Sequence, residues 1–207
     1  MIDSLPEEDN QNCLMIKILL YTGFRRGELC GLKYEDIDFQ NNTISVKRNL
    51  LYLPEKGIFE NTPKTESSIR TISVSGNIIQ LLHKHRVLQT QRRIAVGDKW
   101  NDTGYIFTTW NGSPIHPDTI SGWFRKFIKK YNLPDVSIHS LRHTSATMLL
   151  MNGLPIKAVS TRLGHANAVT TSMIYSHALQ SADEKASEIM DDIMAGNKGK
   201  QNKKKHS

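Results

Sequence analysis

Apolar positions recur at two different spacings along this chain. Most of them repeat every three to four residues, as the buried face of a helix does. The segments with this helical spacing are 13–21, 76–93, 118–131, 138–151, 155–162 and 182–194. Between the first two segments, apolar and polar residues alternate in short runs, which is the spacing of half-buried strands. The pattern therefore predicts a mainly α-helical chain with a small antiparallel β-sheet, an α+β fold.

The predicted strands are short. Residues 37–39 and 43–46 flank the turn residues Asn41 and Asn42, so they predict a β-hairpin. Further strands are expected at 58–60, 69–74 and 105–107. A polar loop with Lys64 near its start connects two of these strands.

Glycines mark the ends of several predicted helices. Gly23 stops the first helix, and Gly153 stops the helix that begins near Ile138. Gly164 is expected to take a left-handed cap conformation at the next helix end. His165 would then lie just beyond that helix.

Length and composition indicate one folded domain with a small appendage. The chain has 207 residues, of which 38% are hydrophobic and 23% charged, so a real core is possible. No run of apolar residues is long enough to predict a membrane span. The only cysteines, Cys13 and Cys30, suggest no disulfide framework and are best interpreted as small core residues. Together with an acidic N-terminus that does not resemble a signal peptide, they favour a cytoplasmic protein.

The positive charge is concentrated at the C-terminus. The formal net charge is +7, and residues 195–207 supply +5 through Lys198, Lys200, Lys203, Lys204 and Lys205. The other 194 residues therefore carry 7 − 5 = +2. A basic tail can tether a polyanion or can simply be a solvated terminus. Because the body is nearly balanced, any nucleic-acid surface on it must arise from local clustering.

The segment 138–144 gathers the most reactive polar side chains. On a helix, His139, Arg142 and His143 lie at i, i+3 and i+4 and share one face. The opposite face carries Leu141, Ser145 and Met148, which predicts an apolar side packed in the core. A guanidinium between two imidazoles suits an oxyanion, although a surface helix with the same residues remains an alternative.

Other basic residues could join this segment. Arg25 and Arg26 directly follow the first buried helix, and Glu28 could hold the Arg25 guanidinium if it points inward. The alternative is a solvated turn with a local ion pair. Lys64 could reach a phosphate or a leaving group, or could simply be exposed. A basic strip on the helix after Gly76 is either a phosphate-facing surface or a solvated face; its residues are His83, Lys84, His85, Arg86, Arg92 and Arg93.

Five short motifs occur in order along the chain: Thr-Gly-Phe-Arg-Arg-Gly-Glu-Leu at 22–29, Pro-Lys-Thr at 63–65, His-Ser-Leu-Arg-His at 139–143, Leu-Gly-His at 163–165 and Tyr-Ser-His at 175–177. With these motifs the chain resembles the catalytic domain of the tyrosine recombinases, the phage integrase family, as found in mobile elements and prophages. The resemblance covers residues from about 5 to 190, and the motifs follow the order expected for the family.

The resemblance implies the tyrosine-recombinase catalytic fold and a role for each motif residue. Arg25 and Arg142 would clamp the oxygens of a scissile DNA phosphate. Tyr175 would attack the phosphorus and form a 3′-phosphotyrosyl link. Lys64 would protonate the departing 5′ oxygen. Hydrogen bonds and proton handling would come from His139 and His165, with Glu28 and His143 in support.

Elementary chemistry agrees with these roles. A phosphodiester resists attack because its anionic oxygens repel nucleophiles and its alkoxide leaves poorly. Donors aimed at developing charge contribute about 3–4 kcal/mol each in well-measured sites, and a positioned acid contributes roughly 10²–10⁴-fold. The covalent ester conserves the bond energy for rejoining, so no cofactor or ATP is expected. No metal is expected either, since the arginines and the lysine carry the charge that Mg²⁺ supplies elsewhere.

The chain also departs from the family pattern. We expect a catalytic domain at 1–194 and a lysine-rich flexible tail at 195–207. The N-terminal core-binding domain that usually precedes the catalytic domain is absent from this sequence, so we expect a part of a longer integrase. The full-length protein would act as a tetramer on double-stranded recombination sites, and the isolated domain would be monomeric.

Three other functions compete with this interpretation. A type IB topoisomerase uses the same tyrosine chemistry to relax DNA, although the close spacing of His165 and Tyr175 favours a recombinase. A metalloenzyme could use His139, His143 and His165 as ligands, but Arg142 would then lie beside the cation. The third is a DNA-binding fragment without catalysis.

Overall fold

The computed structural model describes residues 11–61 and 69–164, and beyond them only the residues 169, 171–173, 176, 183, 187, 190, 191 and 194. Lys64, His165 and Tyr175 lie outside the described residues. So do the tail at 195–207 and most of the helix predicted at 182–194.

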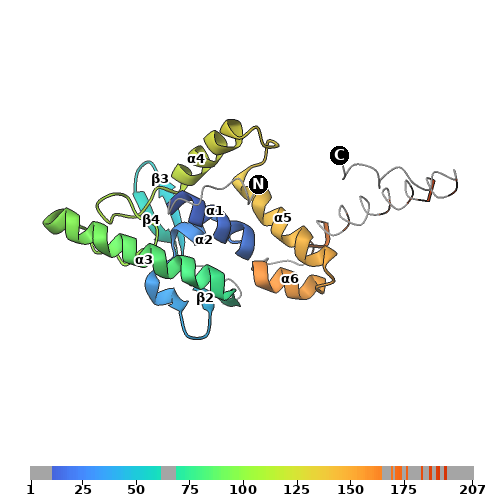
Figure 1. Ribbon diagram of the computed structural model, residues 1–207, viewed down its shortest axis with the longest axis horizontal. Helices are drawn as coiled ribbons and strands as arrows, with labels where there is room; N and C mark the ends of the chain where they lie inside the picture. Colours follow the sequence, from blue (N-terminus) through green and yellow to red (C-terminus); the bar gives the residue numbers. More distant parts are fainter. Residues whose placement is uncertain are drawn as a thin grey trace, which may run out of the picture.

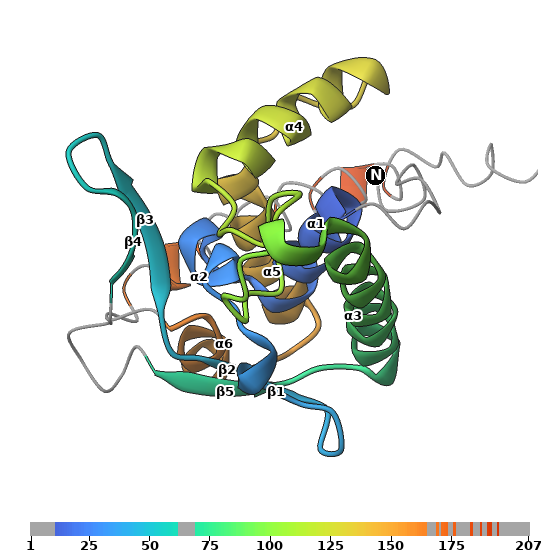
Figure 2. The ribbon, with the colours of Figure 1, turned by 90° about the vertical axis from the view of Figure 1, so that its left-hand side faces the viewer.

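Helix α1 (Gln11–Thr22) lies at the centre of the molecule. Its residues Cys13 to Ile16, Ile18 and Leu19 are all buried. A helix that is apolar around most of its circumference must be covered on several sides. Helices α2 (Arg26–Cys30), α3 (Gly76–Val96), α4 (Pro117–Lys130) and α5 (Ile138–Met151) provide this cover (Figures 1 and 2).

The strands form two small antiparallel sheets. β1 (Ile37–Asp38), β2 (Thr43–Val46) and β5 (Arg70–Ser73) form the first, in the order β1-β2-β5. β3 (Asn49–Leu53) and β4 (Gly57–Asn61) form the second. The hairpin predicted around Asn41 and Asn42 is confirmed by the β1–β2 pairing.

The sequence pattern missed β3 and overpredicted one strand. The side chains of β3 from Leu51 onward are exposed although they are apolar, so no alternation marked this strand. The strand expected at 105–107 is wrong, because only Tyr105 forms a single bridge, to Lys33. Because residues 105–107 are buried, their backbone polar groups need hydrogen-bond partners within the protein. The Ile106 carbonyl accepts hydrogen bonds from the side chains of His85 and Gln89.

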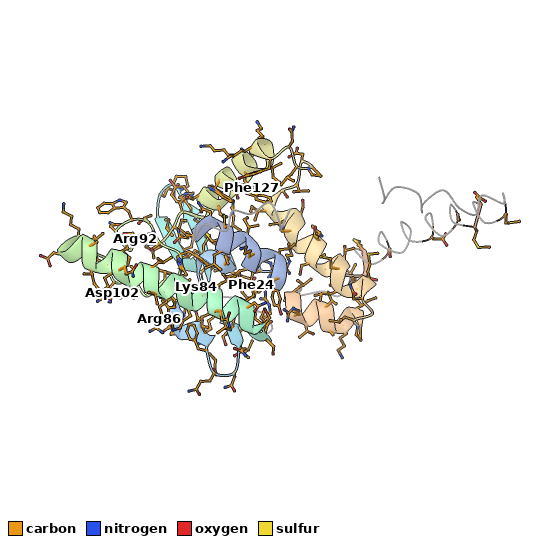
Figure 3. The ribbon with its side chains drawn as sticks, in the orientation of Figure 1. Phe24, Lys84, Arg86, Arg92, Asp102 and Phe127 are labelled. Atoms are coloured by element: carbon orange, nitrogen blue, oxygen red, sulfur yellow. The ribbon has the colours of Figure 1, made fainter. Side chains whose placement is uncertain are left out.

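Helix α3 confirms its prediction but differs in which residues face inward. Val87 is exposed although it is apolar. His85, expected on the polar side, is buried instead. The other strip residues remain outside, and Figure 3 shows Lys84, Arg86 and Arg92 along the helix.

The last helices carry the segments of greatest chemical interest. In α4, Phe124 and Phe127 are buried in the core. Helix α5 begins at a reciprocal cap between Ser137 and Ser140. The short helix α6 (Ile156–Leu163) packs on α5. Short 3₁₀ turns, η1 (Tyr34–Asp36) and η3 (Gly97–Lys99), complete the described elements.

Within the described part of the chain, no helix combines the length and the apolar character needed to cross a bilayer.

Candidate phosphate-binding site

The turn between α1 and α2 points Arg25 toward an open cleft. Gly23 has φ +67°, and a Cβ there would lie 2.3 Å from the Leu163 Cδ2 atom, so both the conformation and the space require glycine. Thr22 closes the turn, because its hydroxyl donates to the Ile18 carbonyl and accepts from the Phe24 N–H. The Thr-Gly-Phe-Arg motif is therefore a structural device that ends one helix and begins the next.

The Arg25 guanidinium is anchored by hydrogen bonds and is still partly exposed to the cleft. Its Nη1 donates to Glu28 Oε1 at 2.8 Å, and its Nη2 donates to the Gly164 carbonyl at 3.0 Å. The side chain remains 44% exposed, which leaves donors available to a ligand. The predicted contact between Glu28 and the Arg25 guanidinium is thus confirmed.

Arg142 reaches the same place from α5. This side chain is buried, with Nη1 donating to the Gly23 carbonyl at 2.5 Å and Nη2 to the Leu163 carbonyl at 2.8 Å. The pKa of Arg142 is lowered to about 10, mainly by burial and also by the nearby charges of Arg25 and Arg70, while Glu28 acts in the opposite direction. Arg142 therefore remains charged at neutral pH. The alternative of a surface helix fails for Arg142, which is buried, whereas His139 and His143 on the same face are exposed.

Met148 corrects the expected orientation of α5. The helical spacing predicts Met148 on the buried apolar face with Leu141 and Ser145, and those two residues are buried. Met148 is instead exposed. Compared with the prediction, the buried face of α5 is rotated to include Arg142 and Ala146, because carbonyl groups in the interior accept hydrogen bonds from the Arg142 guanidinium.

Glu28 is the buried anion that joins the arginines, and one of its partners was not predicted. Arg70, on β5, donates to Glu28 through Nη1 at 3.1 Å and Nη2 at 2.8 Å. Burial acts to raise the pKa of Glu28, but the hydrogen bonds and charges of Arg70 and Arg25 outweigh it and hold the pKa below its ordinary value. A signal for Arg70 did exist, because strand alternation places it on the same inward face as Ile72.

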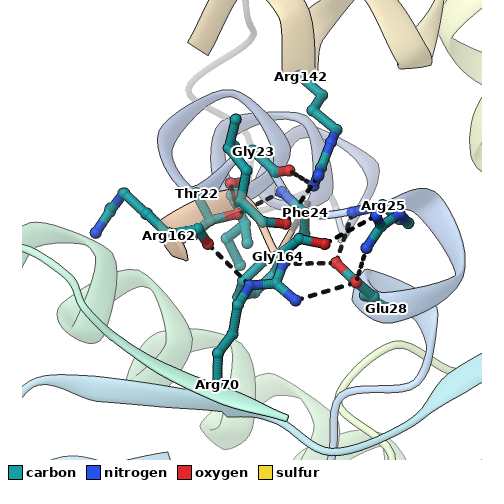
Figure 4. A network of polar contacts seen from close by, with 11 residues as sticks. Thr22, Gly23, Phe24, Arg25, Glu28, Arg70, Arg142, Arg162 and Gly164 are labelled. Atoms are coloured by element: carbon teal, nitrogen blue, oxygen red, sulfur yellow. Dashed lines mark hydrogen bonds and ion pairs between the residues drawn. The ribbon is translucent and has the colours of Figure 1, made fainter. Parts of the chain in front are cut away.

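Figure 4 shows these side chains in one network with the backbone of the α1–α2 turn and of the end of α6. The network borders a cleft of about 1080 Å³ that Arg25, Arg142 and His139 help to line. Arg26 lines it too, bonded to Asp118 and Ser121 of α4. Fixed guanidinium donors around an open cleft suit a planar or tetrahedral oxyanion.

The two histidines of α5 are adjacent. The rings of His139 and His143 meet edge to face, 4.8 Å between centroids. Burial lowers the pKa of His143, as do the charges of His139 and Arg142, so His143 is neutral at pH 7. A supporting position for His143 is consistent with this contact, and its role stays a prediction.

Other predicted features lie apart from the cleft. No α3 residue is among the described residues that line it, so the basic strip does not face this site. Arg86 covers the Tyr34 ring and Arg93 pairs with Asp102, as a solvated face would. No group of histidine, cysteine, aspartate or glutamate among the described residues has a metal-binding arrangement.

The remaining candidates can be located only by their neighbours in the sequence. Lys64 falls between β4 and β5, and His165 directly follows Gly164. Gly164 has φ +68° and ψ +46°, which confirms the predicted left-handed cap. Tyr175 follows ten residues after His165.

Fold and site together define an α+β protein with an arginine-lined, oxyanion-binding cleft. The chain belongs to the phage integrase family, whose model matches residues 2–182. The family predicted from the sequence motifs is thereby confirmed.

Individual relatives are enzymes of mobile elements and related recombinases. A tyrosine recombinase XerC-like protein of Caldanaerobacter subterraneus is 36% identical over 183 residues, covering 83% of this chain and 47% of that protein. The transposase of transposon Tn916 from Enterococcus faecalis is 34% identical over 172 residues, covering 79% of this chain and 41% of that protein. The chain thus spans about half the length of the relatives that it matches.

Solved structures agree with the fold. The Tn1549 transposon integrase, solved in complex with transposon right end DNA, superposes with a TM-score of 0.72 at 29% identity. The match covers 90% of this chain and 62% of that one. The predicted fold class is therefore confirmed.

Proposed function

We propose that this chain is the catalytic domain of a site-specific DNA recombinase, which cleaves and rejoins DNA through a 3′-phosphotyrosyl intermediate. One observation carries the proposal: Arg25 and Arg142 converge from distant parts of the chain on the carbonyls of one turn beside an open cleft. Membership of the phage integrase family and the DNA complex of the Tn1549 integrase support it.

The charge balance of the site fits a phosphodiester. Arg25, Arg70 and Arg142 contribute three positive charges, and Glu28 contributes one negative charge, which leaves a net charge of +2. A phosphodiester carries one negative charge, and the pentacovalent transition state carries nearly two. The site is therefore more complementary to the transition state than to bound DNA, which is the condition for catalysis.

The proposed reaction is one displacement at phosphorus followed by its reverse. The Tyr175 phenolic oxygen bonds to phosphorus as the bond to the 5′ oxygen breaks. Lys64 supplies the proton that the leaving 5′ oxygen takes up, and His139 or His165 accepts the proton that the Tyr175 phenol loses. A 5′ hydroxyl then attacks the phosphotyrosine, restoring the tyrosine and a DNA strand.

We extend the proposal to domains and partners. Residues 1–194 would form the catalytic domain, and the lysine tail at 195–207 would contact the phosphate backbone. The full-length protein would act in the cytoplasm as a tetramer on two duplexes, since exchange of strands requires four cleavage sites.

Trapping the covalent intermediate tests the reaction. The 207-residue protein is incubated in EDTA with a pool of duplexes that carry a nick within randomised sequence, and the products are run on a denaturing gel. We expect a protein–DNA band that disappears in Tyr175→Phe and persists in EDTA. A band that needs added metal, or that survives in Tyr175→Phe, contradicts the mechanism.

Two further readouts separate the alternatives. Relaxation of supercoiled plasmid without joining of separate duplexes would indicate topoisomerase activity. DNA binding with no covalent band in any pool would indicate a binding fragment without catalysis.

A further inference from the structure

We propose that Arg70 is a positioning residue of this site, which keeps Arg25 free for the phosphate and fixes the turn after α6. The inference rests on the proposed function, because it assigns Arg70 a part in phosphate binding and cleavage. It starts from the fact that Arg70 is buried, is not itself among the described residues that line the cleft, and still contacts two of the pieces that build the site.

The first contact is with Glu28, whose carboxylate receives four hydrogen bonds. Oε1 accepts from Nη1 of Arg25 and Nη1 of Arg70, at 2.8 and 3.1 Å. Oε2 accepts from the Arg25 backbone N–H and from Nη2 of Arg70, both at 2.8 Å. Arg70 thus forms the two-pronged pair, whereas Arg25 has a single guanidinium bond to Glu28.

This division matters for Arg25. An unshared buried carboxylate would attract Arg25 into a two-pronged pair of its own and neutralise its charge. Because Arg70 already satisfies Glu28, Arg25 keeps its remaining donors directed elsewhere. The net charge of the cluster also depends on Arg70, since it would fall from +2 to +1 without it.

The second contact is with the end of α6. Three successive carbonyls there each accept from a different arginine. Arg70 Nε donates to the Arg162 carbonyl at 2.8 Å, Arg142 Nη2 to Leu163 at 2.8 Å and Arg25 Nη2 to Gly164 at 3.0 Å. The last carbonyls of a helix lack partners within the helix and form its negative end, so they are natural acceptors for guanidinium groups.

Arg70 also fills the space beneath this turn. A Cβ on Gly164 would lie 2.6 Å from Arg70 Nη1, so the guanidinium packs directly against the glycine. On its other side the Arg70 guanidinium lies 5.4 Å from the centre of the Phe24 ring. A side chain enclosed by the α1–α2 turn, Glu28 and the end of α6 fixes these pieces relative to one another.

Arg70→Lys tests the idea because it keeps the charge but loses the planar fork. The matched control is Arg48→Lys, another largely buried arginine, which pairs with the buried Asp36 and with Glu35. Its hydrogen bonds and ion pairs among the described residues do not involve the arginine cluster. At equal folded fraction, we expect Arg70→Lys to slow covalent-complex formation on the order of 10²-fold. Arg48→Lys should change that rate by no more than about twofold.

A double-mutant cycle separates positioning from an independent effect. In an Arg25→Lys background, adding Arg70→Lys should cost clearly less than its roughly 10²-fold effect in the wild type, because one of the two parts through which Arg70 acts is already altered. Multiplicative losses, or equal losses for Arg70→Lys and Arg48→Lys, would overturn the proposal.

A measurement without cleavage keeps this inference separate from the proposed function. In ¹⁵N NMR spectra, the Arg25 Nε–H signal is assigned by its loss in Arg25→Lys. We expect that signal to shift or broaden in Arg70→Lys and to stay unchanged in Arg48→Lys. An unchanged signal in Arg70→Lys refutes the positioning role even if cleavage is slowed. A wild-type protein that forms no covalent band speaks instead against the recombinase mechanism.

Discussion

The three central arginines carry the same charge but have different surroundings. Arg25 is 44% exposed on its side chain and faces the cleft, whereas Arg70 is 6% exposed and serves Glu28. Arg142 is buried as well, yet it borders the cleft and bonds only to backbone carbonyls in the described contacts. Exposure therefore separates Arg25, which is open to the cleft, from Arg70, which is enclosed, whereas Arg142 is buried and still borders the cleft.

Glu28→Gln should strongly destabilise the protein near neutral pH. Removing the anion from a buried ion pair costs about 3–5 kcal/mol, because it leaves the partner charge uncompensated. Glu28 keeps a folded-state pKa below its ordinary value, so its stabilisation is fully present above the unfolded pKa of about 4.3 and is lost as pH falls through the folded pKa. Urea unfolding at about pH 7 and about pH 3.5 measures both effects.

We expect the difference between wild type and Glu28→Gln to be large at the higher pH and to shrink at the lower one. The control is Glu55→Gln at an exposed position, which should change stability by less than about 0.5 kcal/mol. A difference that stays constant over this pH range would mean that the charge of Glu28 does not stabilise the cluster.

At the scale of elements, α6 contributes to the site mainly through the carbonyl groups at its C-terminal end. The helix has eight residues, but its final carbonyls receive the three arginines from β5, α5 and the α1–α2 turn. Gly164 makes this possible by turning the chain in the left-handed conformation where Arg70 lies close.

Gly164→Ala and Gly57→Ala form a matched pair that tests this geometry. Their φ angles are +68° and +69°, so alanine meets the same left-handed penalty of about 1–2 kcal/mol at both. A Cβ at Gly57 meets nothing within 4 Å, whereas one at Gly164 meets the Arg70 guanidinium. We therefore expect Gly164→Ala to lose more stability in urea unfolding and to slow covalent-complex formation, which Gly57→Ala should not.

Equal stability losses and equal cleavage rates for the two alanine variants would show that the contact between Gly164 and Arg70 has no consequence.

At the scale of the whole molecule, charge is divided between a compact site and a tail. The five lysines of 195–207 should contribute to nonspecific DNA binding by releasing counterions, at about 0.9 per phosphate contact. Deleting 195–207 should therefore reduce the slope of log affinity against log salt by up to about 4.5 on duplex DNA. Fluorescence anisotropy over a range of salt concentrations measures this slope.

A control of equal length replaces the five lysines with glutamine. It should reproduce the effect of the deletion, since charge and not length is responsible. A slope that neither change alters would show that the tail does not touch DNA.

Sequence alone determined the features that depend on neighbouring residues. Helix spacing, the Asn41-Asn42 hairpin and the glycine caps at Gly23 and Gly164 follow from local conformational preferences, and the structure has them. The ordered motifs also determined the family, because a reaction at phosphate needs a particular set of side chains. Strand β3 was not predicted because its exposed residues are apolar, so the hydropathy pattern does not follow the burial of its side chains.

Only the tertiary structure decided how the charged groups are shared. Arg142 reaches the carbonyl of Gly23 across 119 positions of the chain, and Arg70 reaches Glu28 across 42. No local pattern encodes such contacts, since they depend on which elements pack together. The sequence placed Glu28 beside Arg25, and the fold added Arg70 as its main partner. Burial makes that choice, because a carboxylate removed from water must be satisfied by whichever donors the packing brings to it.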